Sequence, residues 1–183
     1  RDSYLASPDD FTDNCGFGLV AHIEGKPSHH LVKTAIHSLS CMTHRGGVAA
    51  DGKTGDGCGL LLAKPVEFFQ VVAAELGLEL EENFAVGMVF LNLDDSLAAH
   101  SQQVLDKEIE QQGLTVAGWR DVPVDLSIVG EIARETLPQF KQVFVNAPAE
   151  LSAEDFNRKL YVARKKAEIA LTEDPLFYVT SLN

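Results

Sequence analysis

The sequence predicts a mixed fold, α/β or α+β, on two observations. Strand-like and helix-like segments alternate along the chain, without an internal repeat or a low-complexity linker between them. The 183 residues are 45% apolar and 23% charged, which is typical of one soluble globular domain that buries roughly 70% of its unfolded surface. Both architectures remain open at this level, because alternation does not fix the strand topology.

The N-terminal part of the chain is predicted to form two strands and two helices around a glycine-rich loop. Ser28 can cap the first helix, whose apolar residues recur on one face. The second strand is a short apolar run of strand length. In chain order, these segments are a strand over 17–23, a helix over 28–44, a loop over 45–57, a strand over 58–64 and a helix around 66–77.

The rest of the chain continues the alternation. A capping box of Ser152 and Asp155, with a hydrophobic staple of Leu151 and Phe156, marks the start of the longest helix. The last apolar stretch ends the chain as a strand, so we expect the segment to be part of a larger domain. In order, the segments are a strand over 84–92, a helix over 96–112 that ends at Gly113, a strand over 114–123, a short helix near 130–137, a strand over 141–147, a helix over 152–173 and a strand over 177–183.

Charge and cysteine content exclude several classes of partner. The net charge of -12 argues against nucleic acid and against anionic membrane surfaces, which both select basic patches. No apolar run approaches the length of a membrane span, and the acidic leader 1–14 does not resemble a secretory signal. Three cysteines without a CxxC pair do not suggest a disulfide framework. We therefore expect a reducing compartment, the cytoplasm or the interior of an organelle.

Cys15 stands at the edge of an apolar run, in the stretch "TDNCGFGLVAHIEG". It is either a small buried hydrophobic residue or a nucleophile on a turn, where Gly16 and Gly18 let a substrate approach the backbone. No base is evident nearby. Cleavage between Asn14 and Cys15 would supply one, because the freed α-amino group titrates near pH ~8. In that case residues 1–14 are a propeptide.

The loop "THRGGVAADGKTGDGCG" offers a second candidate, Arg45. The loop leads into a predicted strand, whereas a phosphate cradle leads into a helix, and it lacks the spaced acidic ligands of a calcium loop. A guanidinium on a glycine-rich loop can grip a carboxylate through two parallel hydrogen bonds. The alternative is an ordinary surface arginine.

A zinc site and a nucleic-acid site are weaker alternatives. Four side chains share one face of the first helix, and Cys58 could add a ligand, but the spacing matches no zinc family, and a solvated helix face explains it equally well. The basic stretch 158–166 is interpreted as solvent-exposed. The four side chains on the helix face are His30, His37, Cys41 and His44.

Residues 13–65, "DNCGFGLVAHIEGKPSHHLVKTAIHSLSCMTHRGGVAADGKTGDGCGLLLAKP", closely resemble the start of the glutamine amidotransferase domain of bacterial glutamate synthase large subunits. The similarity continues through "FAVGMVFLN", "GWRDVP", "VFVNAP" and "FYVTSL" and so covers nearly the whole chain. The order and separation of "NCGFG" and "THRGG…ADGKTGDGCG" make the match specific.

The resemblance implies a class II amidotransferase of the N-terminal-nucleophile hydrolase type, an α+β fold with a four-layer αββα sandwich. It implies that Cys15 becomes the first residue of domain 15–183 after removal of the propeptide, and that its thiolate attacks the side-chain amide of L-glutamine to give glutamate and ammonia. By the same match, Arg45 and Gly46 bind the α-carboxylate of the substrate.

Two departures from the family pattern shape the expectation for this chain. The leader is still attached, so the Cys15 nitrogen is an amide and not a base. The family forms its oxyanion hole from an Asn-Gly pair further along, and no Asn-Gly dipeptide occurs here. Since loss of one oxyanion donor costs ~10²–10³ in rate, we expect this fragment alone to be inactive. An unprocessed, catalytically silent scaffold of the same fold is the alternative.

The family protein also contains sites that we do not expect in residues 1–183. It carries FMN and an iron–sulfur cluster in the remainder of the large subunit, and it works with an NADPH-oxidising small subunit. Three scattered cysteines supply no cluster motif here. The resemblance thus implies reductive transfer of the released ammonia to 2-oxoglutarate, with no cofactor and no metal in this segment.

Overall fold

The computed structural model describes residues 16–42 and 46–183, which divide into two compact units. Unit 1 comprises the described residues up to Leu61 together with Ser127–Glu135, and unit 2 comprises Leu62–Leu126 and Thr136–Asn183. Unit 1 contains the helices α1 (His29–Cys41) and α4 (Glu131–Arg134). Among the described residues, every buried one except Gly130 belongs to unit 2, so the hydrophobic core lies there.

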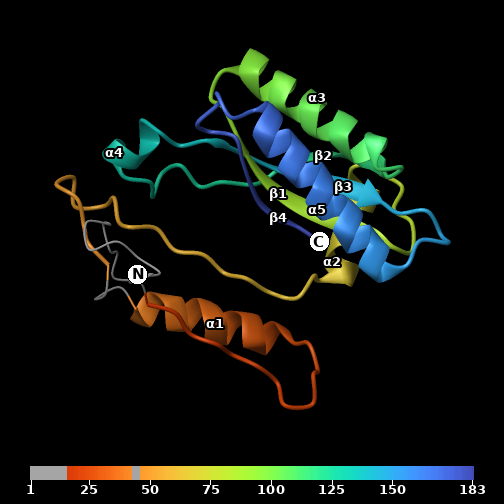
Figure 1. Ribbon diagram of the computed structural model, residues 1–183. Helices are drawn as coiled ribbons and strands as arrows, with labels where there is room; N and C mark the ends of the chain where they lie inside the picture. The colour runs from red at the N-terminus through yellow and green to blue at the C-terminus, as the bar shows by residue number, and fades with distance from the viewer. Residues whose placement is uncertain (1–15, 43–45) are drawn as a thin grey trace, which may run out of the picture. The chain divides into compact units, whose positions relative to one another are not determined.

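The centre of unit 2 is a four-stranded antiparallel sheet with the strand order β2-β3-β1-β4 (Figure 1). The central pair β1–β3 is in continuous register, and irregularities shift the register of β2 and of β4. Four of the six predicted strands are thereby confirmed. Their bounds are β1 (Phe84–Leu91), β2 (Thr115–Asp121), β3 (Gln139–Asn146) and β4 (Tyr178–Leu182).

Two long helices, α3 (Asp95–Gln111) and α5 (Ala153–Ala170), contact each other and cover one face of the sheet (Figure 1). Their apolar residues recur at helical spacing and meet alternate residues of β1 and β3, as expected for an amphipathic helix on a pleated sheet. The fully buried side chains of this cluster include Leu105, Ile109, Leu160, Val89, Leu91, Val143, Val145 and Val179.

The opposite face of the sheet carries a smaller apolar cluster, to which α2 (Val66–Glu75) contributes. Val72 of α2 packs with Phe84 and Phe144, and the ring of Phe69 lies edge-on to that of Phe144 at 5.9 Å. The sheet therefore has apolar contacts on both faces. The helix predicted around 66–77 is confirmed.

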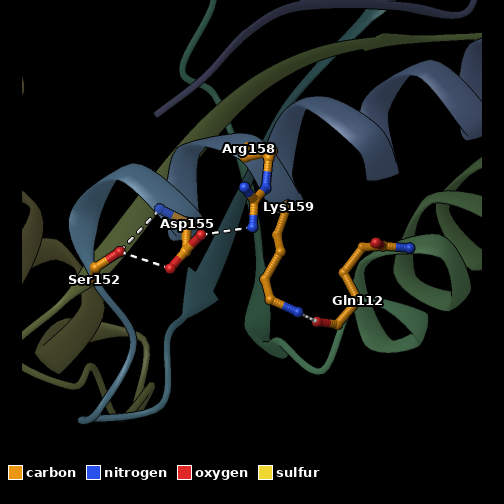
Figure 2. Close-up of polar contacts among 5 residues, drawn as sticks. All are labelled: Gln112, Ser152, Asp155, Arg158 and Lys159. Atoms are coloured by element: carbon orange, nitrogen blue, oxygen red, sulfur yellow. Dashed lines mark hydrogen bonds and ion pairs between the residues drawn. The ribbon is translucent and has the colours of Figure 1, made fainter.

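The long helices begin at side-chain caps. Asp94 accepts from the backbone amides of Ser96 and Leu97 at the start of α3. Ser152 accepts from the Asp155 amide at 3.1 Å at the start of α5, as its sequence position predicts (Figure 2). In addition, Lys159 on α5 donates to the carbonyl of Gln112, the C-cap residue of α3, at 2.5 Å. A cation at a helix C-terminus is favourable, and this contact links the two helices.

The strands predicted over 17–23 and 58–64 are wrong, because the described residues of both segments are irregular. Apolar composition gives a segment its strand propensity, but a strand also needs a neighbour for its backbone groups. Within residues 16–42 and 46–61, the only β pairing is an isolated bridge between Val48 and Gly55. The side chains of Phe17 and Leu61 are accordingly 92% and 91% exposed.

Mixed helices and an antiparallel sheet make the fold α+β, which confirms the fold class at that level. The first helix is also confirmed, with Ser28 as its cap, although α1 has no buried residue. Among the helices of the described chain, none combines the length and the apolar composition that a membrane span requires.

Candidate active site

The predicted site residues lie at or next to the limits of the described residue ranges. Cys15 and Arg45 lie outside the described residues. Gly46 is described and exposed, and it begins a segment of twelve residues, 46–57, which we call the glycine hairpin. Gly46 directly follows Arg45 in the chain, so the geometry of this hairpin bears directly on the predicted carboxylate clamp.

The base of the glycine hairpin is closed by a side chain. The backbone amide of Gly47 donates to a carboxylate oxygen of Asp56 at 2.6 Å. One step further in, Val48 and Gly55 form an antiparallel bridge. The two arms of the hairpin are therefore held together immediately after Gly46.

The tip of the hairpin is organised by Asp51. The amide of Ala49 donates to the Thr54 carbonyl at 2.7 Å, which defines the turn. Asp51 then accepts from the amides of Lys53 and Thr54 at 3.0 and 2.8 Å and from the Thr54 hydroxyl at 2.6 Å. Such local bonds are the reason that Asp is favoured in turns.

The same two side chains bind a distant segment. Asp51 accepts from the Ile132 amide at 3.2 Å, and the Thr54 hydroxyl oxygen accepts from the Ala133 amide at 3.2 Å. These amides lie in the first turn of α4, whose own N-cap residue, Gly130, has no side chain to offer. Asp51 and Thr54 thus cap α4 from 81 and 79 residues away.

Gly130 makes this docking possible. A Cβ atom at position 130 would lie 2.5 Å from an Asp51 carboxylate oxygen and 2.6 Å from the Thr54 nitrogen, and closer still to the Thr54 hydroxyl. Real Cβ atoms do not tolerate such distances, so a side chain here would push the two segments apart. Gly130 is itself buried, as this close approach requires.

The hydrogen bonds fix the charge of Asp51. The Thr54 hydroxyl, followed by the amides of Thr54 and Lys53 and more weakly by that of Ile132, holds the pKa of the Asp51 carboxyl far below its ordinary value. Asp51 is therefore an anion throughout the neutral range. Asp51 is not among the site residues predicted from the sequence, although the Asp-Gly-Lys-Thr stretch is typical of a turn capped by an Asp side chain. The contact of Asp51 with residues 130–134 has no local signal in the sequence.

The zinc interpretation finds no support in the described residues. Cys41 and His37 approach each other, with 3.8 Å between the Cys41 sulfur and the His37 Nε2 atom. No group of three or more His, Cys, Asp or Glu side chains in 16–42 and 46–183 is placed to hold a metal ion. His44, one of the three histidines of that hypothesis, lies outside the described residues.

Comparison with known families shows the class to which the chain belongs. The sequence model of the class II glutamine amidotransferases matches residues 15–183. The chain is therefore a member of the class II glutamine amidotransferase family, as its motifs predict. The match begins at Cys15 and leaves residues 1–14 outside.

Curated proteins that are similar to this chain include glutamate synthases. The chain is 44% identical to ferredoxin-dependent glutamate synthase 1, chloroplastic/mitochondrial, of Arabidopsis thaliana over 162 residues, 87% of this chain and 10% of that protein. It is 40% identical to the glutamate synthase [NADPH] large chain of Bacillus subtilis over 181 residues, 98% of this chain and 12% of that protein. The chain thus spans about a tenth of the length of these relatives, and its predicted resemblance to glutamate synthases is confirmed.

Proposed function

We propose that this chain is the glutamine-hydrolysing part of a glutamate synthase. The observation that carries the proposal is the family match, which begins at Cys15 and runs to the last residue. The names of the relatives add the reaction context, since the similar proteins of Arabidopsis thaliana and Bacillus subtilis described above are glutamate synthases.

Cys15 is the nucleophile in this proposal. Its thiolate attacks the side-chain amide carbon of L-glutamine and forms a C–S bond, and the C–N bond then breaks to release ammonia. Water hydrolyses the resulting thioester, which yields glutamate and restores the thiol. The α-amino group of Cys15 carries the proton from the thiol to the leaving amine, and this requires prior removal of residues 1–14.

Arg45 and Gly46 bind the α-carboxylate of glutamine. The reach and planarity of a guanidinium suit a carboxylate, and the closed base of the glycine hairpin supports this role because it gives the backbone after Arg45 a defined path. The oxyanion donors lie beyond residue 183.

The finer fold assignment is a four-layer αββα sandwich, present here in part. The antiparallel sheet with α3 and α5 on one face supports one sheet layer and one helix layer of that arrangement.

The remainder of the parent enzyme uses the ammonia for reductive amination of 2-oxoglutarate with FMN and an iron–sulfur cluster. We propose an NADPH-oxidising small subunit as the partner of the parent enzyme and the cytoplasm as its location. Ferredoxin is the alternative electron donor, because the similar protein of Arabidopsis thaliana is named a ferredoxin-dependent glutamate synthase.

The test uses the full-length enzyme and two measurements. Intact mass before and after treatment with a glutamine-like diazoketone is expected to show a chain that lacks residues 1–14 and gains one adduct at Cys15. Cys15→Ala is expected to abolish glutamine hydrolysis, whereas the matched controls Cys41→Ala and Cys58→Ala, at exposed cysteines, retain it. An uncut chain that takes no label would instead identify a silent scaffold.

A further inference from the structure

The glycine hairpin and the turn at 130–134 are joined by a continuous set of hydrogen bonds. The set begins where Gly47 binds Asp56, passes through the Val48–Gly55 bridge and the Ala49–Thr54 bond, and reaches Asp51 at the tip. From there, the bonds to the first turn of α4 leave the hairpin. Each step is a backbone contact or a short side-chain contact, so the position of α4 and the conformation after Gly46 are physically coupled.

Asp51 accepts more hydrogen bonds than any other member of this set. Its carboxylate accepts four hydrogen bonds, from three backbone amides and one hydroxyl, and these come from both segments. An amide side chain of the same shape cannot replace it. Asn presents one acceptor and one donor where Asp presents two acceptors, so either orientation sets its NH₂ group against a donor of Thr54 or Ile132.

We propose that Asp51 is a positioning residue for the glutamine site: it holds the glycine hairpin closed and docked on residues 130–134, so that the backbone after Arg45 is ready to receive the α-carboxylate of glutamine. This inference rests on the proposed function, in which Arg45 and Gly46 bind that carboxylate. In this inference Asp51 acts through the backbone after Arg45 and not on the reacting atoms. Its effect is therefore on substrate binding and not on the chemical step at Cys15.

The experiment measures glutamine hydrolysis by the processed full-length enzyme with Asp51→Asn. We expect the KM for glutamine to rise about tenfold with kcat within about twofold of the original value. Losing a hydrogen bond to a charged group shifts an equilibrium by this order, here the docking of the glycine hairpin, and the apparent affinity for glutamine falls with the docked fraction. The diazoketone gives a second readout: its concentration for half-maximal rate rises, and its limiting rate of Cys15 labelling is unchanged.

Variants on the other side of the contact separate positioning from stability. Thr54→Val is expected to raise the KM for glutamine in the same way. Thr54→Ser is expected to keep the original KM, since serine keeps the hydroxyl. Gly130→Ala is expected to reproduce the effect from the distant segment. The matched control is Asp94→Asn, which removes a carboxylate with the same kinds of bonds, to two amides and one hydroxyl, at the start of α3. It should leave KM unchanged.

Two results overturn the inference, and a third overturns its foundation. If Asp51→Asn changes KM no more than Asp94→Asn does, Asp51 does not position the site. If kcat and the labelling of Cys15 by iodoacetamide fall together with an unchanged KM, Asp51 only stabilises the fold. If the unsubstituted enzyme does not hydrolyse glutamine, or Cys15→Ala retains activity, the proposed function fails first and the inference with it.

Discussion

At the scale of single residues, the environments of Asp106 in α3 and of Asp94, the N-cap of that helix, shift the carboxyl pKa in opposite directions. Asp106 is partly buried and accepts from the Trp119 indole at 2.9 Å. Burial and the nearby charge of Glu110 raise its pKa, although the Trp119 bond opposes them. Asp94, the cap of this helix, is exposed, and the Ser96 hydroxyl together with two amides lowers its pKa. The two residues therefore allow opposite effects of pH on stability to be compared at one helix.

Asp106 should make the chain less stable as the pH rises. A raised folded-state pKa means that the folded state binds the proton more tightly, so the free energy of unfolding falls as pH increases from the ordinary Asp value through the folded-state pKa. Asp106→Asn removes this loss and can still accept from Trp119. We therefore expect the substitution to be more favourable at about pH 7 than at about pH 3, measured by urea unfolding.

Asp94→Asn is the control and should show the opposite trend. A lowered pKa contributes stability above the ordinary Asp value, and this contribution is lost as the pH falls through the folded-state pKa. The cost of Asp94→Asn should thus be larger at neutral than at acidic pH. If both substitutions depend on pH in the same direction, the two environments do not act as described.

At the scale of elements, the start of α5 depends on one hydroxyl. Ser152 accepts from the Asp155 amide and donates to the Asp155 carboxylate at 2.9 Å, and Asp155 in turn binds Arg158 at 2.6 Å (Figure 2). Ser152→Ala removes the cap, and we expect the free energy of unfolding to fall by about 1 kcal/mol. Thermal or urea unfolding measures it.

Ser152→Thr retains the hydroxyl and should keep most of that stability. Equal losses for Ala and Thr would show that packing at this position, and not the cap, determines the stability. The Lys159–Gln112 contact lies further along α5 and is left intact by both substitutions (Figure 2).

At the scale of the whole molecule, the two units differ in the protection they offer to backbone amides. The strands β1 and β3 lie at the centre of the sheet and contain fully buried side chains, whereas α1 contains no buried residue. Local opening needs little free energy where few apolar contacts are broken. In hydrogen exchange of the 183-residue chain, we expect β1 and β3 to exchange slowest and α1 to exchange fastest among the long helices. Comparable protection of α1 and β3 would contradict this.

Local signals in the sequence are sufficient to predict most elements. The caps at Ser28 and Ser152, the helical recurrence of apolar residues and the strand-like stretches at 84–92 and 141–147 all predict elements that the fold contains. The motifs around Cys15 and Arg45 indicate the class II amidotransferases, and the family match confirms that class. These features succeed because each depends on residues close together in the chain.

The tertiary structure decided which segments meet. Apolar runs at 17–23 and 58–64 have the composition of strands and still remain irregular, because strand formation depends on a partner that local composition does not specify. The order β2-β3-β1-β4 and the docking of Asp51 on the start of α4 are likewise long-range. The sequence by itself determined most of the elements, the family and the candidate nucleophile. The tertiary structure alone brought Asp51, Thr54 and Gly130 together, since hydrogen bonds across some eighty residues leave no periodic trace in the chain.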